Sequence, residues 1–156
     1  MKHLFAAGVL ALATLISPAQ AQEESTATTA PEITEMALGP EDASVTVMEY
    51  ASFTCPHCAN FHKGPFKQLK ADYIDTGKVR FVYRDVYFDR FGLWASMVET
   101  CLNDRDKAQA LVGWYQENAE AHEVNSTPTL IIDGQKYSNM PYDELKAIID
   151  EKLAAG

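Results

Sequence analysis

The architecture of this protein is set by residues 45–58, VTVMEYASFTCPHC. The first part of this segment is rich in β-branched and aromatic residues, which predicts a strand over Val45–Tyr50. From Pro56 to about Tyr73, apolar side chains recur at the spacing of one helix face, and Pro65 should kink that helix. The cysteines at positions 55 and 58 are therefore expected where a strand ends and a helix begins.

This position predicts unequal chemistry for the two cysteines. A helix amino terminus carries a partial positive charge and unpaired amide donors, which stabilise a sulfur anion at Cys55. His57 adds a further donor or positive charge, and Pro56 at the first helical position fixes the backbone without losing a needed amide. Cys58 lies one turn deeper on the apolar face and should titrate at higher pH. The pair thus offers a nucleophile or leaving group, Cys55, and a resolving thiol, Cys58.

The cysteine pair has two other interpretations. One is half of a zinc site completed by His62, His122 or Cys101, but zinc sites usually use two close ligand pairs and the sequence has no second pair, so no metal is expected. The other is a structural disulfide, which would close too short a loop to restrict the unfolded chain much. His62, one turn past Cys58, is otherwise expected to be a surface or packing residue.

The rest of the chain alternates between strand and helix patterns, as in α/β domains. The predicted strands are 79–86, 129–132 and 135–138, and the predicted helices are 93–102, 106–121 and a final helix from about residue 141. Asp133-Gly134 is a hairpin signal between the last two strands. Trp94, Trp114 and Tyr115, at helical spacing, are expected in the core; the alternative is that too few helices cover them and some are exposed. These elements predict one α/β domain over residues 43–156.

The amino terminus has the features of a secretory signal peptide. Met1-Lys2-His3 is basic, Leu4 to Ile16 is apolar, and an Ala-x-Ala pattern ends at Ala21, which predicts cleavage after residue 21. The apolar run is too short to cross roughly 30 Å of hydrocarbon as a helix. Residues 22–42 are acidic and polar without periodicity, so we expect a disordered linker there. Export would place the thiols where no cytosolic reductant keeps them reduced and disulfides persist.

The charge balance excludes one class of partner. The chain has 13 Lys and Arg against 22 Asp and Glu, for a formal net charge of −9. A protein that neutralises nucleic-acid phosphates needs a basic footprint, so nucleic acid is not expected as a partner.

The motifs together resemble a known family. Cys55-Pro56-His57-Cys58 at a strand-to-helix junction, with Ser126-Thr127-Pro128-Thr129 ahead of a later strand, resembles the thioredoxin-fold thiol oxidases of the DsbA family, of the alphaproteobacterial type. The resemblance implies a central mixed sheet flanked by helices. It also implies that the Thr127–Pro128 bond is cis and lies against the cysteine pair. Glu49 stands at the family's spacing from Cys55 for an acidic residue beneath the resolving thiol, which implies a buried proton acceptor for Cys58. The alternative is that Glu49 is an ordinary solvated strand residue.

One segment departs from the family pattern. The resemblance extends from Ala43 to Leu153, but the all-helical insertion of the family is shortened here to about two helices, over residues 87–123. Relatives often carry a cysteine pair in this insertion. Cys101 therefore has three possible states. It is the remaining cysteine of a lost disulfide, a buried reduced thiol on the same face as Trp94, or a cysteine that forms disulfides between molecules.

The resemblance implies a periplasmic thiol:disulfide oxidase that introduces disulfides into exported proteins. The implied catalytic residues are Cys55, Cys58, His57, Pro56 and Glu49, and the implied substrate-binding residues are Thr127 and Pro128. No cofactor is implied beyond the redox-active disulfide Cys55–Cys58. The implied partners are unfolded exported proteins with free thiols and a DsbB-like membrane quinone reductase, and we expect a monomer. The alternatives are a disulfide isomerase or reductase, a copper-handling or redox-sensing binding module, and a fold whose lost helices abolish activity.

Overall fold

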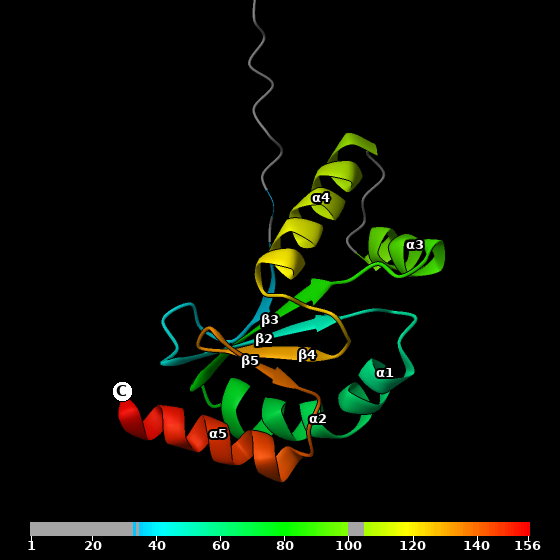
Figure 1. The fold of residues 1–156 in the computed structure, drawn as a ribbon. Coiled ribbons are helices and arrows are strands. Elements are labelled where there is room, and N and C mark those ends of the chain that lie inside the picture. Colours follow the sequence, from blue (N-terminus) through cyan, green and yellow to red (C-terminus); the bar gives the residue numbers. More distant parts are fainter. Residues whose placement is uncertain (1–32, 34, 100–104) are drawn as a thin grey trace, which may run out of the picture.

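A five-stranded mixed sheet forms the centre of the protein in a computed structural model that describes residues 33, 35–99 and 105–156 (Figure 1). The strand order is β1-β3-β2-β4-β5. The strands are β1 (Met36–Leu38), β2 (Val45–Ala51), β3 (Val79–Asp85), β4 (Thr129–Ile132) and β5 (Gln135–Ser138). Strands β2 and β3 are parallel, and the other neighbouring pairs are antiparallel. This arrangement confirms the predicted thioredoxin-like α/β fold.

Helices cover both faces of the sheet. They are α1 (Pro56–Lys63), α2 (Pro65–Leu69), the π-helical turn η1 (Lys70–Ile74), α3 (Arg90–Glu99), α4 (Arg105–Ala121) and α5 (Tyr142–Ala155). Helices α1, α2 and α5 lie on one side of the sheet, and α3 and α4 lie on the other (Figure 1). Of the helices in the described ranges, none is long and apolar enough to cross a membrane.

The main core lies between the sheet and the helices α1, α2 and α5. Successive side chains of a strand point to opposite faces, so Val45, Val47 and Glu49 of β2 share one face while Tyr50 lies on the other. The buried cluster on the first face consists of Val45, Val47, Phe61, Leu69, Tyr73, Ile74, Val79, Phe81, Leu130, Ile132, Leu145 and Ile149. Glu49 therefore continues an apolar row of side chains and is itself buried.

The helix that follows the cysteine motif is broken, as the sequence predicts. Helix α1 ends at Lys63, Gly64 adopts φ −123° and ψ −90°, and Pro65 begins α2. Proline lacks an amide proton and its ring clashes with the preceding turn, so the helix cannot continue straight through this position. The π-helical turn that carries the segment on to Ile74 was not predicted.

The predicted start of the domain at Ala43 is wrong. Residues 36–38, placed by composition in a disordered linker, form strand β1, which pairs antiparallel with β3. A three-residue edge strand is too short to show a periodic pattern, and its order comes from pairing with a strand far along the chain. The predicted signal peptide and the linker residues 22–32 and 34 lie outside the described residues.

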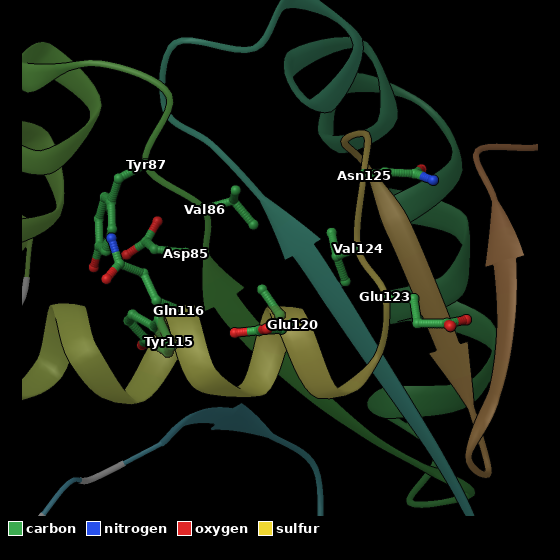
Figure 2. A pocket seen from close by; sticks show the side chains of 10 residues that line it. Asp85, Val86, Tyr87, Tyr115, Gln116, Glu120, Glu123, Val124 and Asn125 are labelled. Carbon is green, nitrogen blue, oxygen red and sulfur yellow. The ribbon is translucent and has the colours of Figure 1, made fainter.

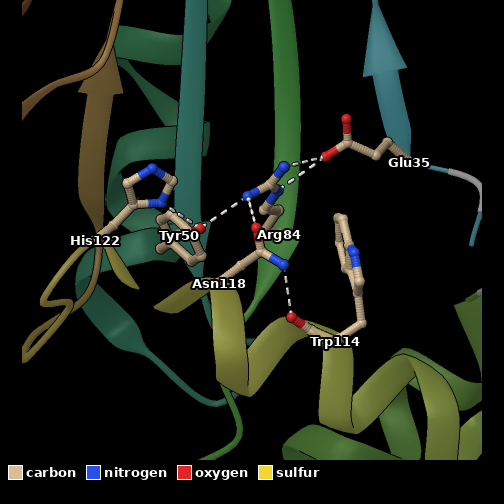
Figure 3. Close-up of polar contacts among 6 residues, drawn as sticks. All are labelled: Glu35, Tyr50, Arg84, Trp114, Asn118 and His122. Atoms are coloured by element: carbon tan, nitrogen blue, oxygen red, sulfur yellow. Dashed lines mark hydrogen bonds and ion pairs between the residues drawn. The ribbon is translucent and has the colours of Figure 1, made fainter. Parts of the chain in front are cut away.

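A buried arginine attaches the amino-terminal segment and α4 to the sheet (Figure 3). Arg84 donates hydrogen bonds to Glu35 Oε1 at 2.8 and 2.6 Å, to the Tyr50 hydroxyl at 2.9 Å and to Asn118 Oδ1 at 2.7 Å. Its guanidinium also lies 4.6 Å from the ring centroid of Trp114. The planar guanidinium suits this combination of several acceptors and an aromatic face. One side chain of β3 thus joins three segments that are distant in sequence.

The predicted core position of Trp94 is wrong. Tyr115 on α4 is buried as expected and Trp114 is half-buried, but the Trp94 side chain on α3 is 54% exposed. Its indole packs edge-to-face on Phe91, which is also exposed. No further helix among the described residues covers this face of α3. Cys101, for which the sequence leaves three states open, lies outside the described residues.

Candidate active site: a dithiol at the amino terminus of helix α1

A tight turn after β2 delivers the cysteine motif to the end of the sheet. Strand β2 ends at Ala51, and the backbone amide of Cys55 donates to the carbonyl oxygen of Ser52 at 3.0 Å. The amide of Val86 donates to the carbonyl oxygen of Ala51 at 2.7 Å, which holds the carboxyl ends of the parallel strands β2 and β3 side by side. The motif therefore lies at the carboxyl edge of two adjacent parallel strands, where α/β folds commonly place their sites.

The same turn is held from the side by the start of α3. Asp89 accepts the backbone amides of Phe91 and Gly92 at 2.8 and 3.0 Å, and it accepts the Thr54 hydroxyl at 2.9 Å. One carboxylate thus caps α3 and fixes the loop before the cysteines. Gly92 allows this close approach, because a Cβ atom there would lie 3.2 Å from the Ser52 hydroxyl oxygen.

Cys55 is the N-cap residue of α1. Its backbone is extended, with φ −90° and ψ 114°, and its Sγ accepts the amide of Cys58 at 3.3 Å. Pro56 occupies the first helical turn, where its missing amide proton costs no hydrogen bond. Burial opposes ionisation of Cys55, but hydrogen bonds from Cys58, Thr127 and the backbone amides of Cys58 and His57 outweigh it and lower the pKa of Cys55. His57 therefore acts on Cys55 through its backbone, and its side chain is exposed.

Cys58 differs from Cys55 in both burial and acidity. Its side chain is only 3% exposed. Burial, followed by the hydrogen bond with Cys55, raises the pKa of Cys58 to about 12. Both thiols are free in the structure. The outer sulfur is thus the one that holds negative charge readily, while the inner sulfur stays protonated.

A second loop completes the site from the other half of the chain. The Thr127–Pro128 peptide bond is cis, and Pro128 is buried. Strand β4 starts at Thr129, which pairs with Tyr50 on β2, so the loop lies beside the end of the strand that carries the cysteines. The Cys55 thiol donates to the carbonyl oxygen of Thr127 at 3.4 Å.

Glu49 lies behind the cysteine helix and pairs with His62. The Glu49 side chain is 0% exposed, and its Oε2 lies 2.8 Å from His62 Nε2. Burial raises the pKa of Glu49, although His62 partly opposes this shift. His62 is the functional candidate that the sequence interpretation missed. The available signal was its spacing from Cys58, which places both side chains on one helix face.

One hollow adjoins the dithiol, and a larger one reaches the segment that precedes the cis-proline loop. The smaller, of about 200 Å³, is lined by Ser52, Phe53, Cys55, Cys58, Ala59, His62 and Tyr83. The larger, of about 510 Å³, lies between α4, the end of β3 and the segment that leads to the cis-proline loop (Figure 2). Its lining includes Val86, Gln116, Ala119, Val124 and Asn125. The site therefore has a small chamber behind the sulfurs and a groove that reaches Asn125, close in sequence to Thr127.

The histidines considered as zinc ligands are engaged elsewhere. His62 bonds Glu49, and His122 Nδ1 lies 2.7 Å from the Tyr50 hydroxyl on the opposite face of the sheet (Figure 3). Within the part of the chain that the structure describes, no group of three or more His, Cys, Asp or Glu side chains could hold a metal ion.

Fold and site together define a thioredoxin-fold protein with a CPHC dithiol at a helix amino terminus, facing a cis-proline. A family model described as thioredoxin matches residues 31–109 and 98–151. The chain belongs to this family.

Curated relatives are similar over most of this chain. A Rickettsia bellii protein named "Putative protein-disulfide oxidoreductase" is 33% identical over 121 residues, which are 76% of this chain and 47% of that protein. A Rickettsia conorii protein named in the same way is 29% identical over 147 residues, which are 89% of this chain and 53% of that protein. The chain thus spans about half the length of these relatives.

Solved structures show the same fold. Wolbachia pipientis alpha-DsbA1 superposes with a TM-score of 0.72 at 20% identity, covering 81% of this chain and 94% of that one. Oxidised BdbD from Bacillus subtilis superposes with a TM-score of 0.67 at 20% identity, covering 77% and 93%. The fold is therefore the DsbA-like variant of the thioredoxin fold.

Proposed function

We propose that this protein is an exported dithiol–disulfide oxidoreductase that acts as an oxidase, transferring the disulfide of Cys55 and Cys58 to other proteins. The observation that carries the proposal is the unequal placement of the two sulfurs: Cys55 is the N-cap of α1 and its Sγ accepts the Cys58 amide at 3.3 Å, whereas Cys58 is only 3% exposed. This placement lowers the pKa of Cys55 and raises that of Cys58. The names of the Rickettsia relatives support an activity of this class. No cofactor beyond the redox-active cysteine pair is needed for this chemistry.

The transfer proceeds by two exchanges at the outer sulfur. A substrate thiolate attacks Cys55 Sγ of the oxidised pair, the Cys55–Cys58 bond breaks, and Cys58 leaves and takes up a proton. A second substrate thiolate then attacks the substrate sulfur bound to Cys55, forming the substrate disulfide and expelling the Cys55 thiolate. A leaving group of low pKa departs readily, and its stability as a thiolate favours the reduced enzyme as product. The more stable the reduced enzyme is, the more readily the oxidised enzyme accepts electrons from substrate thiols.

Substrate would bind along the cis-proline loop. The Thr127 carbonyl lies 3.4 Å from Cys55 Sγ, so an extended peptide that reaches the sulfur also reaches this backbone. The groove that ends at Asn125 would accept side chains that flank the substrate cysteine (Figure 2). The substrates we propose are unfolded exported proteins with free thiols, as the signal-peptide pattern of residues 1–21 supports.

Each turnover leaves the cysteine pair reduced, so a second partner is required. We assign this role to a DsbB-like membrane protein that passes electrons to quinone. The exposed aromatic side chains of α3, next to the loop that carries Cys55, would lie at such an interface. We propose that the protein works as a monomer in the periplasm.

A single turnover with a reduced peptide that contains two cysteines tests the proposal. The oxidised protein should convert the reduced peptide to its disulfide stoichiometrically, with loss of one enzyme disulfide per peptide disulfide formed. The C55A and C58A variants, neither of which can form the Cys55–Cys58 disulfide, should both leave the peptide reduced. A protein that leaves the peptide reduced, while its own disulfide persists, would exclude the oxidase function.

A further inference from the structure

We propose that His62 is the proton relay of the dithiol, carrying protons between solvent and the buried Glu49 whenever Cys58 is deprotonated or reprotonated. The inference rests on the proposed function, and it adds a residue to which the redox motif itself gives no role.

Glu49 has no route of its own to water. Its side chain is 0% exposed and it continues the row of β2 side chains that point into the core. Oε2 bonds His62 Nε2 at 2.8 Å, while Oε1 is buried with no hydrogen-bond partner among the residues described. A buried, charged carboxylate with one oxygen unpaired is costly, and uptake of a proton removes the buried charge. Glu49 is therefore a good proton acceptor that needs a second group to exchange protons with solvent.

His62 is placed to be that group. Its side chain is 35% exposed, so the imidazole spans the distance between the buried carboxylate and the surface. The ring is held by Phe66, with centroids 4.6 Å apart, and by Phe61 and Tyr83 at 5.7 and 6.0 Å. These contacts fix the plane of the ring and keep Nε2 directed at Glu49. Imidazole can accept a proton at one nitrogen and release one from the other near neutral pH.

Cys58 shares this environment. The small chamber behind the sulfurs is lined by Cys58, His62 and Tyr83 together. Tyr83 is the β3 neighbour of Glu49, and the charges of Glu49, Cys58 and Asp85 all act on its phenol. Burial and these charges raise the pKa of Tyr83, so the phenol stays neutral. The ionisable side chains that face the relay are thus Cys55, Cys58, Tyr83 and Asp85.

The relay acts when the reduced pair is reoxidised. Cys55 is then joined to the partner in a mixed disulfide, and the Cys58 thiol gives its proton to Glu49. The Cys58 sulfur attacks Cys55 Sγ, the Cys55–Cys58 bond forms, and the bond from Cys55 to the partner breaks. Its electron pair leaves on the partner sulfur as a thiolate.

His62 then transfers the proton to solvent. The proton passes from Glu49 to His62 Nε2, and His62 releases its Nδ1 proton to water. When the enzyme next oxidises a substrate, Cys58 leaves as a thiolate and the same path runs backwards. This return step restores the original tautomer of His62, so the ring need not rotate.

The test separates the reaction of Cys55 from that of Cys58. An aromatic disulfide that releases a coloured thiolate is mixed with the reduced protein under stopped flow. The first equivalent of colour reports attack by Cys55, and the second reports attack by Cys58 on the mixed disulfide. We expect H62Q to slow the second phase about tenfold or more and to leave the first phase unchanged, because Gln can still bond Glu49 but cannot carry a proton. The matched H122Q change, on the opposite face of the sheet, should alter neither phase.

A second variant distinguishes a relay from a packing role and covers the case in which H62Q fails to fold. In H62A, imidazole added to the buffer should restore the second phase, and it should have no effect on wild type or on E49Q. An H62Q protein whose second phase matches wild type, or an H62A protein that imidazole cannot rescue, overturns the proposal. Neither phase shows whether the protein acts as an oxidase or a reductase. Failure of the proposed oxidase function would therefore appear in the peptide assay, and failure of the relay would appear only in the second stopped-flow phase.

Discussion

The Cys55 thiol donates a hydrogen bond to the carbonyl oxygen of Thr127, 3.4 Å away, although the two residues are 72 positions apart in the chain. The pairing of β2 with β4 brings them together, since each residue lies just outside one of these antiparallel strands. The redox motif and the loop that would receive substrate are therefore fixed by the same pair of strands. Changes at Thr127 should act on the chemistry of Cys55 as well as on binding.

Replacing Thr127 by valine should raise the pKa of Cys55. The Thr127 side chain is one of the hydrogen-bonding groups that lower this pKa, and valine keeps the shape but removes the hydroxyl. The rise should be partial, because the amides of Cys58 and His57 still stabilise the thiolate. Thiolate absorbance measured against pH checks this prediction. T46V, a matched change on the same sheet away from the sulfurs, should leave the titration unchanged. An unshifted T127V curve would assign the low pKa to the Cys58 thiol and the backbone amides without the Thr127 hydroxyl.

Replacing Glu49 by glutamine should change how stability depends on pH. Burial raises the folded-state pKa of Glu49 above its ordinary value of 4.5, so the folded protein binds this proton more tightly than the unfolded chain does. The stabilisation is complete below the unfolded pKa and is lost as pH rises through the folded pKa, at about 1.4 kcal/mol for each pH unit that separates the two pKa values. E49Q should remove that loss. Urea unfolding of both proteins in acid and at neutral pH should show a gain for E49Q at neutral pH only, and equal differences at both pH values would contradict the assignment.

Replacing Arg84 by methionine should destabilise the protein without altering the cysteines. The Arg84 side chain is nearly buried and bonds Glu35, Tyr50 and Asn118, so its loss leaves an uncompensated carboxylate and unpaired polar groups. We expect a loss of about 3 kcal/mol in the free energy of unfolding. Arg80 on the same strand has a buried Nε with no hydrogen-bond partner in the described ranges, so R80M should cost much less. Similar losses for both variants would show that the network adds little.

Filling the larger groove should separate peptide oxidation from simple thiol chemistry. Gln116 lies on α4 and lines this groove, whereas Gln68 is exposed on α2 (Figure 2). Q116W should lower kcat/KM for oxidation of a cysteine peptide about tenfold and leave the reaction with a small disulfide unchanged, since only the peptide needs the groove for its positioning. Q68W should match wild type in both assays. A peptide rate that Q116W leaves intact would place the substrate elsewhere.

The parts of the molecule that the sequence predicts are those governed by local patterns. The strand over residues 45–51, the break at Pro65 and the position of the cysteines at a helix start all follow from neighbouring residues. The parts it does not predict depend on contacts between distant segments. Strand β1 is ordered by β3, and Trp94 is exposed because no other helix in the described part of the chain covers that face of α3. The proton-relay role proposed for His62 could not be predicted from its sequence neighbours either, because it depends on a buried carboxylate that the preceding strand supplies.

The reduction potential of the Cys55–Cys58 pair, obtained by equilibrating the purified protein with known ratios of reduced and oxidised glutathione, is the most direct test of the proposed oxidase. If the structure stabilises the Cys55 thiolate as described, the potential should be less negative than about −200 mV, clearly above the value of about −270 mV for thioredoxin. A potential as low as that of thioredoxin would contradict the oxidase assignment and favour a reductase.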